Sequence, residues 1–79
     1  RALDKDIVDE IESIILSHKK VNSFHWLKTR SDGVFNFVEF HLVLEPDMIL
    51  LDAHRIAEEI EESIMKLDTN RRWVMTPHF

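Results

Sequence analysis

Histidine is the residue type in this chain that could bind a metal or take part in chemistry. The chain holds five histidines and no cysteine. His25, His41, His54 and His78 fall on or beside different predicted elements, and His18 ends the first helical run. Imidazoles from separate elements converge only if the fold brings them together. If it does, nitrogen and carboxylate ligands suit Zn²⁺ or another divalent transition metal.

Length and composition restrict the classes of protein to which the chain can belong. Its 79 residues predict one small domain, residues 1–79, with a thin core that a metal or a partner subunit would help to stabilise. The absence of cysteine excludes disulfides and thiolate zinc sites. A net charge of −5 and a pI near 5.4 argue against a nucleic-acid partner. Because the chain begins at Arg1 without a methionine, we expect a domain excised from a longer protein.

Hydrophobic periodicity predicts two helices and three strands. Apolar residues recur with helical spacing over residues 4–18 and 50–67, and they alternate over residues 21–30, 34–45 and 72–76. The order is therefore α-β-β-α-β. A right-handed crossover from the second strand to the third places both helices on one face of a three-stranded sheet. The predicted fold class is an α+β, ferredoxin-like sandwich that lacks the first strand.

The pattern of the hairpin predicts its register. If Arg30 pairs with Asn36, then Trp26 opposes Phe40 and joins the apolar face that the helices cover. The same register places His25 directly opposite His41 on the other face, with Cβ atoms about 4.5–5.5 Å apart and within reach of one metal ion. The hairpin thus supplies the strongest local signal for a metal site.

The face of the sheet that carries the two histidines has no predicted cover. Four apolar side chains lie on it in this register: Leu27, Phe35, Phe37 and Val43. An uncovered, half-apolar sheet face is typical of an interface, and we expect a homodimer to form there.

The remaining features argue against catalysis. The single glycine makes a nucleotide cradle improbable, and no serine lies in a nucleophile elbow. We therefore predict that the domain is not an enzyme. His18 resembles a cation placed favourably at a helix C-terminus rather than a ligand. His78 is predicted to lie in an exposed tail.

Three segments resemble one known family. They are HWLKTRSDG (25–33), FVEFHLVLEP (37–46) and AHRIA (53–57), the last followed by an Ile-Glu pair at 60–61. In order and spacing these segments are similar to the C-terminal cytoplasmic domain of the cation diffusion facilitator family, whose members are zinc, iron, cobalt and manganese antiporters. The resemblance covers nearly the whole chain.

The resemblance implies a metallochaperone-like domain that dimerises on the cytoplasmic side of the cell membrane, beneath a transmembrane domain of the same full-length chain. It further implies that metal bound between the subunits stabilises a closed dimer and promotes transport. Carried over by position, the family's ligands fall on His25, His41 and His54. In the last family motif, Thr76 stands in place of a histidine and His78 in place of an aspartate. We therefore expect one site of three or four ligands, with His78 as the additional ligand.

The expected function is metal sensing and dimerisation in a divalent-cation efflux transporter. Binding requires neutral imidazoles, so affinity should fall as the pH drops through about 6.5. Two alternatives remain open at this point: a dimerisation module without tight metal binding, and a ferredoxin-like sensor of a small molecule. A third, an acylphosphatase-like enzyme that uses Arg30 and Asn36, ranks lowest.

Overall fold

The two helices and three strands follow one another in the predicted order. A computed structural model describes residues 1–79, and its elements are α1 (Lys5–Ser17), β1 (Ser23–Ser31), β2 (Phe35–Val43), α2 (Leu50–Met65) and β3 (Arg72–His78). None of the helices has the length and apolar character that a membrane crossing requires. β3 continues two residues beyond its predicted end, so His78 belongs to the sheet and the predicted tail is wrong.

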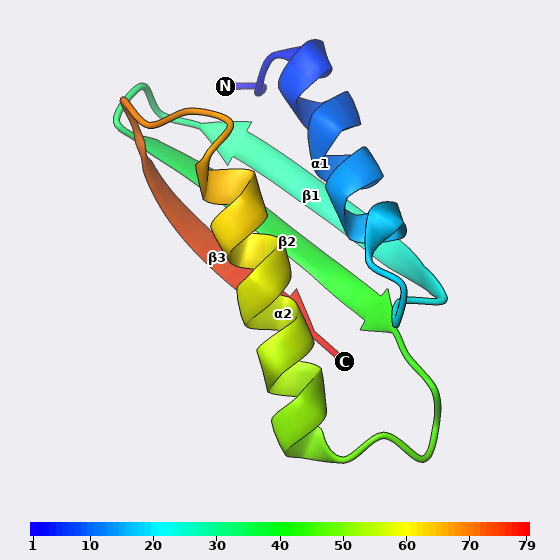
Figure 1. The fold of residues 1–79 in the computed structure, drawn as a ribbon. Coiled ribbons are helices and arrows are strands. Elements are labelled where there is room, and N and C mark those ends of the chain that lie inside the picture. The colour runs from blue at the N-terminus through cyan, green and yellow to red at the C-terminus, as the bar shows by residue number, and fades with distance from the viewer.

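The sheet has the order β1-β2-β3, with β2 in the centre. β1 pairs with β2 antiparallel, and β2 pairs with β3 parallel through the α2 crossover. Both helices lie on the same face of the sheet (Figure 1), which confirms the predicted sandwich. We call the face without helices the outer face.

The core lies between the helices and the inner face of the sheet. α1 contributes Ile11 and Ile15, whose spacing of four residues keeps them on one side of the helix. In β2 every second residue is buried, and Phe40 is completely enclosed. α1 begins after Asp4, whose carboxylate accepts the backbone N–H of Asp6 at 2.9 Å. Helical and strand periods in the sequence therefore build one continuous core.

A β-bulge interrupts the β1–β2 ladder directly after His25. His25 pairs with His41 as predicted, but the next paired residue on β1 is Lys28, which faces Glu39. Two residues of β1 thus stand opposite Phe40 alone. One of the two, Trp26, has a positive φ of 52°. The predicted register is correct up to His25 and wrong beyond it.

The bulge exchanges the faces of the residues that follow it. Leu27 packs against the core cluster, so its predicted place on the outer face is wrong. Trp26 is 71% exposed rather than buried beside Phe40. The extra residue in β1 is the physical reason for both corrections, because it reverses the alternation of side chains along the strand.

The shifted register also separates Arg30 from Asn36. Arg30 pairs with Phe37, and its guanidinium carbon lies 3.8 Å from the centroid of that ring on the outer face. Asn36 instead pairs with Ser31, and its side chain is completely buried. The two residues therefore do not form the pair that an acylphosphatase-like site would need.

Candidate metal centre

Three of the predicted ligands lie in one row across the outer face. His25 is the register partner of His41 on the neighbouring strand, and His41 is in turn the partner of His78 on β3. Neighbouring strands are about 4.8 Å apart, so adjacent members of the row can share an ion, whereas His25 and His78 are separated by about twice that distance. His41 is therefore the central residue of the row.

The rings of His25 and His41 lie close to the separation that shared coordination of one ion would require. Their ring centroids are 6.3 Å apart with an interplanar angle of 47°. Two imidazoles bound to one zinc ion have centroids about 5–6 Å apart, given Zn–N bonds of about 2.0–2.1 Å. The observed separation is therefore slightly larger than that of two rings on one ion. Both rings line a cavity of about 440 Å³ at the end of the sheet, and imidazole nitrogen is a donor that zinc accepts readily.

His54 does not join this pair. It is an exposed residue of α2, and its ring meets the ring of Phe79 edge-on at a centroid distance of 5.2 Å. Phe79 also lines the cavity that holds His25 and His41. No three histidine, aspartate or glutamate side chains of the single chain lie close enough together to hold a metal ion. Within one chain, His25 and His41 therefore have no third potential ligand beside them.

His78 has a different neighbour. Its Nε2 lies 2.8 Å from Oε2 of Glu39, the carboxylate next along the outer face of β2. These two side chains and His41 line a second cavity of about 400 Å³. Thr76 pairs with Glu39 in the β2–β3 ladder, so Thr76 lies on the same face.

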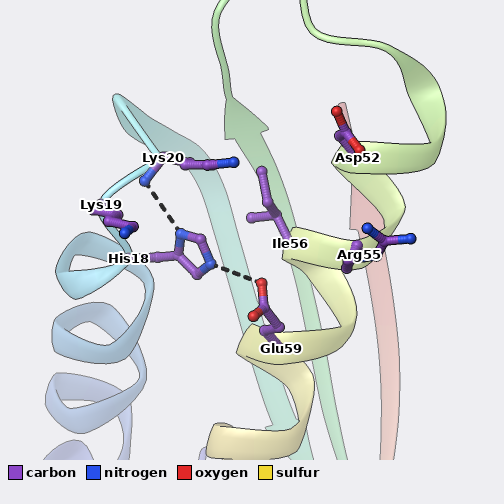
Figure 2. Close-up of a pocket in the computed structure, with 7 residues that line it drawn as sticks. All are labelled: His18, Lys19, Lys20, Asp52, Arg55, Ile56 and Glu59. Atoms are coloured by element: carbon purple, nitrogen blue, oxygen red, sulfur yellow. Dashed lines mark hydrogen bonds and ion pairs between the residues drawn. The ribbon is translucent and has the colours of Figure 1, made fainter.

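His18 lies away from the row, between the two helices. Its Nε2 is 3.1 Å from Oε1 of Glu59 on α2, and its Nδ1 accepts the backbone N–H of Lys20 at 3.2 Å (Figure 2). His18 caps the C-terminus of α1, where it was predicted to lie, and links this helix end to α2. It borders a cavity of about 430 Å³ lined by His18, Lys19, Lys20, Asp52, Arg55, Ile56 and Glu59.

Sequence reasoning missed an aromatic residue at the site. The Trp26 ring centroid lies 5.4 Å from that of His25 and 5.6 Å from that of His41. Regular alternation along the strand predicts that Trp26 lies in the core. The local sequence does not indicate the bulge that places Trp26 on the outer face. The proximity of a tryptophan to His25 in the sequence was the only available signal.

The remaining predicted interface residues keep their place on the outer face. Phe35, Phe37 and Val43 are half-buried there, and the rings of the two phenylalanines lie 6.1 Å apart. Both helices cover the opposite face (Figure 1). The role of Phe35, Phe37 and Val43 in an interface between two copies stays a prediction.

Comparison with known proteins identifies the family to which the sequence is similar. The family model described as "Cation efflux protein, cytoplasmic domain" matches residues 3–76. The cation-efflux pump FieF of Citrobacter koseri is 38% identical over 66 residues, and FieF of Escherichia fergusonii is 36% identical over 66 residues. Each match covers 84% of this chain and 22% of the relative, so the chain spans 22% of the length of these pumps.

Three solved structures share the fold of this chain. The metal-bound C-terminal domain of the CzcD transporter from Thermotoga maritima has a TM-score of 0.82 and 23% identity, covering 94% of this chain and 85% of that one. CzrB has a TM-score of 0.80 and 26% identity, covering 98% and 96%. The cytosolic domain of a cation diffusion facilitator family protein has a TM-score of 0.81 and 23% identity, covering 94% and 87%. The chain belongs to the family of cytoplasmic domains of cation efflux proteins.

Proposed function

We propose that this domain senses metal in the cytosol for a divalent-cation efflux transporter and dimerises when it binds the ion. The ion would be zinc or another divalent transition metal. The observation that carries the proposal is the opposition of His25 and His41 on a sheet face that no other element covers. Histidine nitrogen is a ligand for several such metals, and it binds them in the neutral state.

The lack of a third ligand within one chain gives a reason for dimerisation. Zinc prefers four ligands in a tetrahedron, and the pair supplies two. Two copies that meet by their outer faces would bring ligands of both copies within reach of one ion. His54 and His78 are the further ligands that we propose for positions that the pair leaves open. The apolar side chains of Phe35, Phe37 and Val43 beside the row would provide the contact area of such a dimer.

Metal would act on the transporter by shifting an equilibrium. An ion that binds the closed dimer more tightly than the separated subunits stabilises the closed state by that difference in affinity alone. In the full-length protein, the closed state would bias the transmembrane domain to which this domain is joined. The zinc form of CzrB and the metal-bound CzcD domain support metal binding by this fold.

Sedimentation velocity with and without zinc tests the proposal. We expect zinc to shift the domain from monomer toward dimer, and we expect the His25→Ala/His41→Ala variant to show no shift. His18→Gln is a matched control, because it removes an imidazole outside the row and keeps a donor for Glu59. A dimer population that zinc leaves unchanged in the native protein would contradict the proposal.

A second candidate function is a dimerisation module that does not bind metal tightly. The observation that favours it is the lack of a third ligand near the pair within one chain. The same experiment separates the two functions, because this module would form the same dimer in zinc and in chelator.

A further inference from the structure

Trp26 has a conformation that protein stability alone does not explain. Its φ of 52° lies in the left-handed region, which costs a bulky L-residue about 1–2 kcal/mol. The side chain is 71% exposed, so the domain gains little from burying the indole. Strained backbone of this kind persists where the surrounding structure enforces it, often at a functional site.

The bulge has one clear consequence for the site. It places Trp26 on the same side of β1 as His25, although the two residues are consecutive and regular strand alternation would put them on opposite faces. The indole then touches both imidazoles. It lies edge-on to His41, with an interplanar angle of 88°, and tilted by 48° to His25. The three rings form one cluster, with ring-centroid distances between 5.4 and 6.3 Å.

We propose that Trp26 is a positioning residue of the metal site, and this inference rests on the proposed function. The indole restricts the rotation of both imidazoles and holds them facing one another before the ion arrives. His25 is exposed and would otherwise sample several rotamers, each of which has to be abandoned on binding. Preorganisation by Trp26 therefore raises metal affinity without Trp26 being a ligand.

The same contact makes Trp26 a reporter of the site. When the rings rotate to a shared ion, the indole has to change its packing against them. Zn²⁺ is a d¹⁰ ion without redox chemistry, so a change in Trp26 emission reports this movement rather than electron transfer to the metal. The chain has one other tryptophan, Trp73, at the opposite end of the sheet, where its Nε1 donates to the carbonyl of Asp68 at 2.9 Å.

Three variants made in a Trp73→Phe background test the inference. Trp26→Gly removes the indole and places at this position the residue that tolerates positive φ best. Trp26→Phe keeps an aromatic ring, and unchanged Trp26 is the reference. For each, zinc affinity is measured by calorimetry at constant pH, and the free energy of unfolding is measured in urea. Zinc-dependent emission of Trp26 is recorded at the same protein concentration as the calorimetry.

We expect Trp26→Gly to weaken zinc binding about tenfold, which corresponds to the cost of immobilising about one or two side chains. The domain should still fold. Trp26→Phe should restore part of the affinity. Emission from Trp26 should change in proportion to bound zinc. Unchanged or tighter zinc binding by Trp26→Gly would overturn the inference. So would Trp26 emission that zinc leaves unchanged, because an indole packed against both imidazoles has to respond when they bind the ion.

The results that would refute the proposed function differ from those that would refute the role of Trp26. If the domain with Trp26 intact binds zinc no better than the His25→Ala/His41→Ala variant, the metal site itself is refuted. If that pair is required for zinc binding and Trp26→Gly binds equally well, only the role of Trp26 is refuted.

Discussion

His25 and His41 face each other at the last regular position of the β1–β2 ladder before the bulge. The neighbouring pair, Phe24 and Leu42, fixes this register because Leu42 is buried in the core and cannot move to the outer face. A slip of one residue would exchange the faces of every side chain in this part of the strand. The core thus holds the two imidazoles opposite each other without any contribution from a metal.

The link between His18 and Glu59 predicts a stability effect that is separate from metal binding. His18→Ala removes a hydrogen bond between α1 and α2 and leaves the backbone N–H of Lys20 without its acceptor. We expect the free energy of unfolding to fall by about 0.5–1.5 kcal/mol, measured by urea denaturation. A cycle with Glu59→Ala should reveal coupling between the two side chains. A loss of zinc affinity in His18→Ala would contradict the separation of this link from the metal site.

Asp32 predicts part of the acid sensitivity of the fold. Backbone N–H groups of Phe35 and Val34 donate to its carboxylate at 2.7 and 2.9 Å and hold the pKa of Asp32 below its usual range. The unfolded chain therefore binds the proton first, so this stabilisation is present above about pH 4 and is lost as the pH falls through the folded-state pKa.

Asp32→Asn keeps an oxygen acceptor for both N–H groups and removes the titration. Urea unfolding between about pH 5 and pH 3 should show a smaller loss of stability in this variant than in the native protein. Equal losses in the two proteins would contradict the assignment.

Val43 tests the outer face as the interface. A charge introduced by Val43→Glu should prevent two copies from burying this face, because an unpaired carboxylate is costly to desolvate. We expect a monomer by sedimentation velocity in the presence of zinc, with a far-ultraviolet circular dichroism spectrum like that of the native domain. Leu16→Glu is the matched control, since Leu16 is 55% exposed on α1, away from the outer face. A dimer that survives Val43→Glu and dissociates in Leu16→Glu would place the interface on the helices.

Regular elements could be predicted from the sequence because their periods are strong. The four-residue spacing of Ile11 and Ile15 indicates a helix, and the alternation in β2 indicates a half-buried strand. The topology follows because a parallel pair needs a crossover of one hand. The opposition of His25 and His41 could be predicted for the same reason, since it depends only on the register beside the core.

The bulge could not be predicted, and most errors derive from it. Left-handed backbone at a tryptophan has no sequence signal, whereas glycine or asparagine there would have given one. The predicted end of β3 falls two residues short, directly before Pro77, which lacks an N–H group. β3 is an edge strand, however, where proline is tolerated, and the strand continues to His78. The position of His54 depends on how α2 packs, which periodicity does not define.

Calorimetric titration of the metal-stripped domain with zinc near neutral pH tests the central claim most directly. The native domain is compared with His25→Ala/His41→Ala and with His18→Gln. The account predicts saturable binding in the native domain and in His18→Gln, and its loss in the double variant. Equal binding in all three proteins would show that the opposed histidines are not a metal site.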